Sequence, residues 1–409
     1  MQTRLTPEFA ATAEGREAEA ILRRCVHCGF CTATCPTYQL LGDELDGPRG
    51  RIYLIKQVLE GEAPTRATQL HLDRCLTCRN CETTCPSGVQ YGRLADIGRK
   101  LVDERVPRPA GERLLRDVLK AGLTSPLFAP AMKLGQTLRP LLPAALKAKV
   151  QVPRAAGTWP ARTHARRVIL LEGCVQPAMQ PNINTATARV LDALGIEVLR
   201  PAAAGCCGAL RYHLNDHDGG LADARRNVDA WWPLVEAGAD AIVINASGCG
   251  TQVKDYGHLL AHDAAYAEKA ARIAALARDL IEVVAPHASA VKSRLKPGLA
   301  SEPVVFHPPC SLQHGQQIRG QVEALLTAAG AQLLPFAEPH LCCGSAGTYS
   351  VLQPELSHQL RDRKLAALEA GRPQRILSAN IGCISHLAGG TATEVMHWVE
   401  WLDARLVPA

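Results

Sequence analysis

Residues 25–36 read Cys25-Val-His-Cys28-Gly-Phe-Cys31-Thr-Ala-Thr-Cys35-Pro36. Further on, the chain repeats the pattern as Cys75-Leu-Thr-Cys78-Arg-Asn-Cys81-Glu-Thr-Thr-Cys85-Pro86. Both stretches have the spacing C-x₂-C-x₂-C-x₃-C-P, which sets three thiols at three-residue intervals and a fourth before a proline turn. Soft thiolate ligands select iron–sulfur clusters or zinc. The repeated motif therefore predicts that the first hundred residues fold around two metal centres.

This spacing is the bacterial ferredoxin run, in which the fourth cysteine binds the other cluster. The rule predicts two [4Fe–4S] clusters and two groups of ligands. The first ligand group is Cys25, Cys28, Cys31 and Cys85, and the second ligand group is Cys75, Cys78, Cys81 and Cys35. Zinc is the alternative, but zinc sites usually show two separated C-x₂-C pairs.

The segment between the two motifs exceeds that of a minimal ferredoxin, so we expect a helical ferredoxin-type domain over residues 1–106. Within this segment, GPRGRIYLIKQVLEG follows a Pro/Gly turn and carries Ile52, Ile55 and Leu59 on one stripe. That spacing predicts a helix with one buried face.

The bulk composition narrows the class of protein. The chain has 409 residues, 16 cysteines, a net charge of +6 and only 4% aromatic residues. Few aromatic side chains are available to stack bases, so we expect no nucleic-acid partner. The N-terminus lacks a signal pattern and no apolar run approaches the roughly 20 residues of a membrane span. We therefore expect a cytoplasmic location, where dense cysteines indicate metal or redox chemistry rather than disulfides.

Residues 107–167 form a basic connector. They contain twelve Lys/Arg against Glu112 and Asp117, a net charge of +10. Helical segments such as AGERLLRDVLKAGL are expected, interrupted at Pro126, Pro130, Pro140 and Pro143. The leucines and lysines of MKLGQTLRPLLPAALKAKV suit the surface of an anionic membrane, and a solvated helical linker is the alternative.

Residues 168–300 and 301–409 are two copies of one unit. The first reads RVILLEGC, LDALGIEVLRPAAAGCCGAL and ADAIVINASGCG, and the second reads EPVVFHPPC, LLTAAGAQLLPFAEPHLCCGSAG and QRILSANIGC. Short β-branched runs alternate with helical segments, which predicts βαβ units with short parallel sheets. The whole chain is thus expected to be an α+β multidomain protein: a helical domain, a basic helical linker and two α/β units.

The remaining eight cysteines divide equally between these two units. The first unit has Cys174, Cys206, Cys207 and Cys249, and the second has Cys310, Cys342, Cys343 and Cys383. They follow the β runs, at the edge where parallel sheets place their sites. The repeated spacing favours a metal–sulfur or thiol redox centre, while buried structural cysteines are the alternative. Gly208 and Gly344 predict a positive φ or a close backbone approach beside each pair.

With both halves considered, the chain resembles the glycolate oxidase iron–sulfur subunit family over its whole length. The strings CVHCGFCTATCPTY, CLTCRNCETTCPSGVQYG, LEGCVQP, INASGCG and EPHLCCGSAGTYS carry this resemblance. The wider family, with two ferredoxin motifs and two CCG units, includes iron–sulfur subunits of lactate-utilisation and glycerol-3-phosphate dehydrogenase systems, and heterodisulfide-reductase-type proteins. These are the alternative assignments.

The resemblance implies a subunit of glycolate dehydrogenase that does not oxidise substrate alone. Two FAD-type subunits would oxidise glycolate to glyoxylate, and this chain would pass their electrons toward quinone or another respiratory acceptor. We see no G-x-G-x-x-G or P-loop motif, so no flavin is expected on this chain. The basic linker would bring it to the cytoplasmic face of the inner membrane as a peripheral protein.

The CCG units of this chain depart from the pattern of the wider family at one position. In heterodisulfide-reductase-type units the last cysteine usually belongs to C-x₂-C, but here Gln252 and His386 stand at the second cysteine's position. A five-cysteine cluster therefore does not carry over unchanged. A four-thiolate cluster, ligation by His386 and a metal-free site are the options, and His213 and His307 are candidates for coupling proton transfer to electron transfer.

Overall fold

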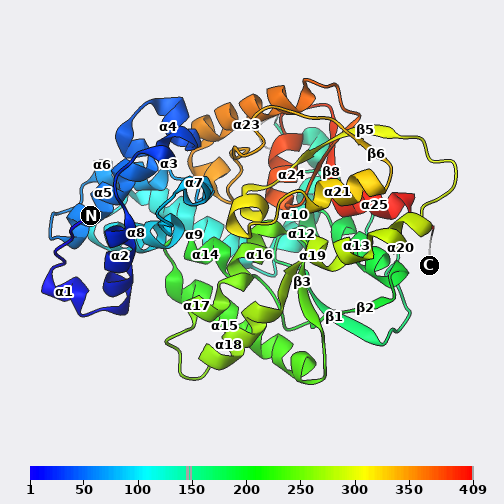
Figure 1. Cartoon of the computed structure of the whole chain (residues 1–409), viewed down its shortest axis with the longest axis horizontal. Helices are drawn as coiled ribbons and strands as arrows, with labels where there is room; N and C mark the ends of the chain where they lie inside the picture. Colours follow the sequence, from blue (N-terminus) through cyan, green and yellow to red (C-terminus); the bar gives the residue numbers. More distant parts are fainter. Residues whose placement is uncertain (144–146, 148–149, 408–409) are drawn as a thin grey trace.

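A computed structural model describes residues 1–143, 147 and 150–407 of the chain. Part of the segment expected to suit a membrane surface, residues 144–146 and 148–149, lies outside the described residues. Figure 1 shows the N-terminal helices at one end of the molecule and the two sheet-containing units at the other. Among the described residues, no helix is long and apolar enough to cross a membrane.

The N-terminal part is entirely helical. Its α-helices are α1 (Pro7–Ala10), α2 (Ala13–Arg24), α3 (Phe30–Ala33), α4 (Pro36–Leu41), α5 (Pro48–Leu59), α6 (Arg66–Asp73), α7 (Asn80–Thr84) and α8 (Tyr91–Arg105). Helix α5 begins with proline at N1, where no amide donor is needed, and buries Ile52, Ile55 and Leu59 against α8. The helix predicted from this stripe is confirmed.

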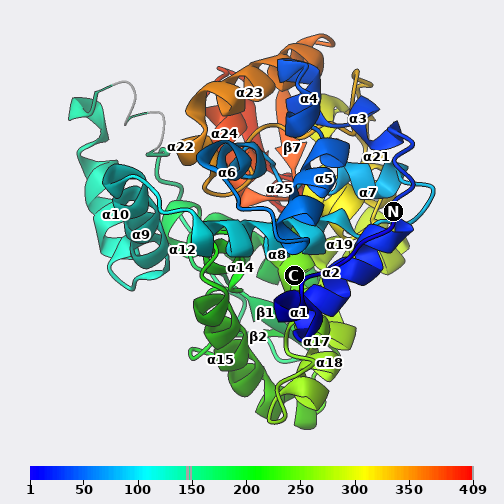
Figure 2. The same ribbon diagram turned by 90° about the vertical axis from the view of Figure 1, so that its left-hand side faces the viewer.

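The linker contains helices α9 (Ala110–Thr124) and α10 (Phe128–Thr137), which lie together at one side of the molecule (Figure 2). Pro126 separates them, as expected. Pro130 does not interrupt a helix, because it lies in the first turn of α10, where the helix leaves the amide hydrogen unused. From residue 151 to 164 the chain runs without regular secondary structure to the first sheet.

The first sheet has four parallel strands in the order β2-β1-β3-β4. The elements of this unit are β1 (Arg166–Leu171), α12 (Gln176–Met179), α13 (Asn182–Ala193), β2 (Ile196–Leu199), α14 (Ala209–Tyr212), α15 (His217–Glu236), β3 (Ala241–Ile244), α16 (Ser247–Lys254), α17 (Tyr256–Leu259), α18 (Ala267–Leu276), β4 (Ala277–Asp279), α19 (Leu280–Val284) and α20 (Ala288–Ser293).

The second sheet repeats this arrangement in the order β6-β5-β7-β8, also parallel. Its elements are β5 (Glu302–His307), the π-helical turn η4 (Ser311–Gly315), α21 (Gln321–Ala328), β6 (Ala331–Leu333), α22 (Tyr349–Leu352), α23 (Pro354–Glu369), β7 (Arg375–Ser378), α24 (Ile381–Ala388), β8 (Glu394–His397) and α25 (Trp398–Arg405). The predicted pair of α/β units with short parallel sheets is confirmed.

The two units share one hydrophobic core. Val168 and Leu170 of β1 belong to the same buried cluster as Val304 and Ile376 of the second sheet, and α13 packs against α25. Alternate residues of β1 point the other way and pack in a separate cluster that includes Trp231. This packing orients the units so that helix α16 of the first lies against η4 of the second.

Candidate functional site

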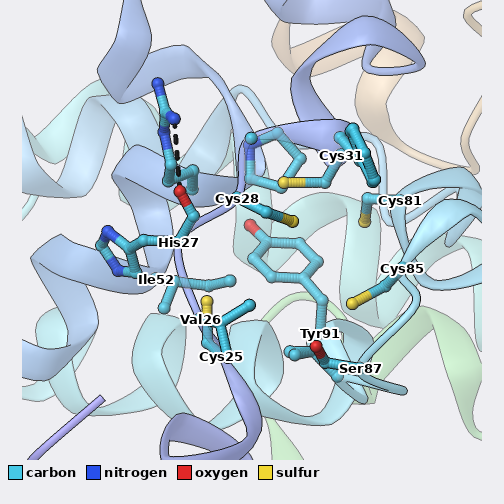
Figure 3. A pocket seen from close by; sticks show the side chains of 15 residues that line it. Cys25, Val26, His27, Cys28, Cys31, Ile52, Cys81, Cys85, Ser87 and Tyr91 are labelled. Carbon is cyan, nitrogen blue, oxygen red and sulfur yellow. Dashed lines mark hydrogen bonds between the residues drawn. The ribbon is translucent and has the colours of Figure 1, made fainter.

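The first ligand group surrounds a pocket near the surface, which we call the first pocket. Cys25, Cys28, Cys31 and Cys85 line it, with the ring of Tyr91 among them, and Cys81 also reaches it (Figure 3). Burial raises the pKa of Cys31 to about 11, and the other three sulfurs of the group add to the shift. Cys28 is exposed, so this pocket communicates with solvent.

The loops of both motifs adopt the same unusual backbone. His27 and Gly29 in the first loop, and Thr77 and Arg79 in the second, all have φ between 52° and 86°. Residues other than glycine rarely adopt a positive φ, and backbone strain of this kind is often found at functional sites. Gly29, with φ of 86°, lies beside Arg49, whose guanidinium would be 2.7 Å from a Cβ at this position.

The second ligand group lies inside the molecule, and we call the region of its four cysteines the second pocket, although only Cys75 and Cys78 line the large cavity described below. The pKa of Cys81 is raised well above its usual range by burial, and then by repulsion from Cys78, Cys75 and Cys35. Cys78 faces a further thiol, since Cys310 of the second unit is the largest charge acting on it. The second pocket therefore adjoins the cysteines of the second CCG unit.

Two buried arginines flank the second pocket. Arg51 donates to the carbonyl of His71 at 2.7 Å and pairs with Asp46 at 3.4 Å. Arg99 of α8 donates to the carbonyl of Leu72 at 3.0 Å. Burial alone would raise the pKa of Cys75, but Arg51 and Arg99, with hydrogen bonds from Thr77 and Tyr91, outweigh burial and lower the pKa. Positive charge beside a bound cluster would favour the more negative, reduced state of that cluster.

The other arginines near the motifs differ in their surroundings. Arg24 is exposed, and Arg49 pairs with Glu44 at the surface. Arg74 reaches Asp46 at 2.9 Å, and Arg79 reaches Asp255 of the first unit at 3.1 Å.

The eight repeat cysteines lie at the carboxyl ends of the parallel strands. In each unit, one cysteine follows the first strand, the adjacent pair follows the second, and the last begins the helix after the third. The sulfurs of Cys310 and Cys342 are 3.8 Å apart. In the first unit, hydrogen bonds with Cys174 and Cys207 lower the pKa of Cys206 to about 3. In each unit, hydrogen bonds join the four cysteines in series, from the first through the adjacent pair to the last.

Both adjacent pairs depend on the glycine that follows. Gly208 and Gly344 each have φ of 87°, and the amide of each donates to the sulfur of the first cysteine of its pair at 3.4 Å. A Cβ would lie 2.4 Å from the Gly220 carbonyl oxygen or 2.5 Å from that of Ser357. The predicted positive φ and close approach are both confirmed.

A cavity of about 570 Å³ connects the second pocket with both CCG units. Its cysteines are Cys75, Cys78, Cys174, Cys206, Cys207, Cys249, Cys310, Cys342 and Cys383. Leu123 of α9 and Phe128 and Met132 of α10 close one side. The linker therefore supplies part of the wall.

The three histidines singled out in the sequence have different environments. His213 lines the cavity and lies 3.1 Å from Asp96. His386 also lines it, with its Nε2 3.1 Å from the Ser357 hydroxyl. His307 is fully buried at the end of β5, where one of its ring nitrogens and the sulfurs of Cys343 and Cys383 all lie within 4.8 Å of one another.

The donor sets fit iron–sulfur clusters. None of the sixteen cysteines forms a disulfide, and they gather in groups in which neighbouring sulfurs raise the pKa of thiols such as Cys31 and Cys81. A bound cation removes this penalty, since thiolate ligands are deprotonated by the metal. Thiolates of this number and softness are the ligands of iron–sulfur clusters.

Known proteins match this arrangement along the whole chain. Residues 21–89 match the 4Fe-4S dicluster domain, and residues 168–254 and 304–388 each match the cysteine-rich domain. The glycolate oxidase iron-sulfur subunit of Escherichia coli (strain K12) is 54% identical over 408 residues, covering 99% of both chains.

The chain belongs to the glycolate oxidase iron–sulfur subunit family. The probable glycolate oxidase iron-sulfur subunit of Bacillus subtilis (strain 168) is 31% identical, covering 93% of this chain and 91% of that protein. Lactate utilization protein A of Bacillus licheniformis is 28% identical over 58% of this chain and its own full length. The resemblance drawn from the motifs is confirmed, and the dicluster domain implies two [4Fe–4S] clusters.

Sequence reasoning missed Arg99 and Tyr91. Both lie on α8, after the last cysteine, and neither has a diagnostic spacing from the motifs. Arg99 faces the second pocket only because α8 packs back across the cysteine loops. The family match covers the cysteines of both halves but gives no role to these two residues.

Proposed function

We propose that this member of the glycolate oxidase iron–sulfur subunit family is an electron-transfer subunit. It would accept electrons from two FAD-type subunits that oxidise glycolate and pass them toward quinone or another respiratory acceptor. The observation that carries this proposal is a series of neighbouring thiols. The exposed Cys28 lines the first pocket together with Cys81, Cys81 interacts with Cys78, and Cys78 faces Cys310 at the central cavity. The chain would not oxidise glycolate alone.

We propose the two ligand groups as the ligands of the two clusters: Cys25, Cys28, Cys31 and Cys85, and Cys75, Cys78, Cys81 and Cys35. When bound, the clusters supply one-electron transfer, with potentials set by hydrogen bonds, charge and exposure. The chain's residues supply those conditions, with solvent near the first group and Arg51 and Arg99 near the second. The division at residues 106, 167 and 300 remains our proposal for the functional domains.

The surface around the first pocket is the proposed docking site of the flavin partner. Val26 and Phe30, which line the pocket, are 68% and 60% exposed, and Tyr53, whose ring is 6.3 Å from that of His27, is 46% exposed. Exposed aromatic and aliphatic side chains grouped beside a functional pocket are typical of protein interfaces. Docking at this surface would place the donor next to the ligand group that reaches solvent.

The repeat half is the proposed exit for electrons. The thiols of Cys310 and Cys342 adjoin Cys78, and they pack with Leu76 and Tyr349 in one apolar cluster. The eight repeat cysteines are proposed to hold one further iron–sulfur centre or more. The cavity that they line is the proposed place where electrons reach the acceptor.

The substitution Cys28→Ser tests the route. It removes one ligand of the first group, so the complex should lose quinone reduction while the flavin subunits still reduce an artificial acceptor dye. Iron content should fall by about four per chain, the content of one cluster. Unchanged quinone reduction would show that electrons do not pass through this group.

The linker is the proposed site of peripheral membrane contact. Leu134 and Leu141 are 61% and 82% exposed, on a segment with a strong positive charge. Apolar side chains among basic residues bind anionic lipid surfaces, with about 1 kcal/mol from each Lys or Arg near the surface.

Vesicle flotation tests this contact. Wild-type protein should float with vesicles that contain phosphatidylglycerol and not with neutral ones. The double variant Leu134→Glu/Leu141→Glu should stay in solution, whereas Leu299→Glu, at an exposed leucine outside the linker, should float normally. Equal flotation of both variants would show that the linker is solvated.

A further inference from the structure

The two CCG units differ at one strand end that is otherwise equivalent. In the first unit, Leu171 ends β1 and pairs with Ile244 of β3. In the second unit, His307 ends β5 and pairs with Ser378 of β7. The same register thus presents two apolar residues in one unit and two polar residues in the other.

Leu171 shows what this position needs for packing alone. It belongs to a buried apolar cluster that contains Cys207 and is packed by Cys249. These two cysteines correspond to Cys343 and Cys383, which lie beside His307. An aliphatic side chain therefore satisfies the strand end next to the thiols.

Packing does not explain the presence of a histidine at position 307. It is 0% exposed, and neither ring nitrogen has a hydrogen-bond partner among the described residues. Burying an unpaired imidazole costs free energy that leucine does not cost. One ring nitrogen nevertheless lies within 4.8 Å of the sulfurs of Cys343 and Cys383, within the reach of a shared metal.

A buried cation also faces this group. Lys364 of α23 is 3% exposed, donates from Nζ to the Glu338 carbonyl at 2.6 Å, and interacts electrostatically with Cys342 and Cys343. A lysine is rarely buried unless negative charge compensates it. Its ammonium group is placed to offset the negative charge that metal-bound thiolates of the second unit would carry.

We propose that His307 is a ligand of an iron–sulfur centre in the second unit, with the thiolates of Cys310, Cys342, Cys343 and Cys383. The proposal rests on the proposed metallation of the repeat half. It assigns the second unit five ligands and the first unit four. It also assigns the histidine role to His307 rather than His386, which bonds to Ser357.

Ligation by a neutral imidazole affects the reduction potential of the centre. At a given ligand position imidazole adds no negative charge where thiolate adds one, and imidazole ligands raise the potential in this way in Rieske centres. The centre of the second unit, next to Cys78, would therefore attract electrons more strongly than a centre with five thiolates. That order suits the transfer of electrons out of the second pocket.

Pulsed EPR on the full-length protein, purified anaerobically with its own iron and reduced, tests the ligand. Protein labelled with ¹⁵N-histidine should show hyperfine coupling to a directly bound nitrogen. His307→Gln should lose this coupling and His386→Gln should keep it. His307→Cys should retain the iron, lose the coupling and titrate at a lower potential.

Iron and sulfide analysis tests separately whether the repeat half binds metal and whether His307 is a ligand. More than eight irons per chain without histidine coupling would overturn the role of His307 and leave the metallated repeat half standing. Eight irons per chain would overturn both, and the Cys28→Ser test would still decide the electron route. Coupling lost in His386→Gln instead, or zinc in place of iron, would also overturn the assignment.

Discussion

The two N-terminal pockets are built from the same motif but have opposite surroundings. The first pocket opens to solvent at Cys28 and is bordered by the exposed Phe30. The second pocket is covered by the second CCG unit, and Asn80, at the position equivalent to Phe30, is only 3% exposed. Identical ligands can therefore serve as an entry and as an internal relay. The difference comes from what packs around them.

The largest expected effect of this difference is on stability. Arg51 and Asp46 form a fully buried ion pair beside the second pocket, whereas Arg49 and Glu44 form a half-exposed pair beside the first. Arg51→Leu should lower the free energy of unfolding by roughly 3 kcal/mol, because it leaves Asp46 with less compensation in the interior. Arg49→Leu should cost less than about 1 kcal/mol.

Anaerobic urea denaturation, followed by the visible absorbance of the clusters, measures both variants. Similar midpoints for the two would show that Arg51 is not essential to the second pocket. Partial retention of stability in Arg51→Leu would be explained by Arg74, which pairs with Asp46 at 2.9 Å. The double variant Arg51→Leu/Arg74→Leu should then be destabilised further.

The next effect is on access to the metal. When an iron chelator is added anaerobically, iron should leave the first pocket faster than the second. Iron in the second pocket should be released only after the interface between that pocket and the second CCG unit opens. Each 1.4 kcal/mol of opening free energy slows release by about tenfold, so we expect at least that ratio. Stopped-flow absorbance should resolve two phases.

Assignment of the phases uses the ligand variants. Cys28→Ser should abolish the fast phase and Cys78→Ser the slow one. A single phase, or a slow phase lost in Cys28→Ser, would contradict the assignment of the first pocket as the exposed one.

Much of this arrangement could be predicted from the sequence, because local spacing determines it. The three-residue intervals of Cys25, Cys28 and Cys31 predict a loop around one centre, and the repeated CCG spacing predicts two equivalent α/β units. The apolar stripe of α5 is likewise a local signal.

The rest depends on contacts between segments that are distant in the sequence. Arg99 reaches the second pocket through the packing of α8, and His307 approaches Cys343 and Cys383 only because three strands end at one edge of the sheet. Spacing alone favours His386, which stands at the motif position, and gives no indication of His307. Tertiary packing also decides that the second pocket is covered and the first is open.

The smallest expected effects are those of Asn80 and Phe30, the two equivalent motif positions, where one substitution should affect folding stability and the other should affect partner binding. Asn80 donates from Nδ2 to the carbonyls of Thr34 at 3.0 Å and His340 at 3.2 Å, which ties the second loop to the second unit. Asn80→Ala should lower the free energy of unfolding by about 1–2 kcal/mol, since it removes one hydrogen bond from each of two carbonyls and the contact between the loop and the second unit. It should not change the affinity for the flavin subunits.

Phe30→Ala should do the reverse. An exposed side chain contributes little to folding, so the free energy of unfolding should stay within about 0.5 kcal/mol of wild type. Loss of an aromatic residue at the proposed docking surface should weaken binding of the flavin subunits by about 1 kcal/mol or more. Denaturation and calorimetric titration with the purified flavin subunits measure the two quantities. If Phe30→Ala bound normally, the entry would lie elsewhere on the surface, and the openness of the first pocket would need another explanation.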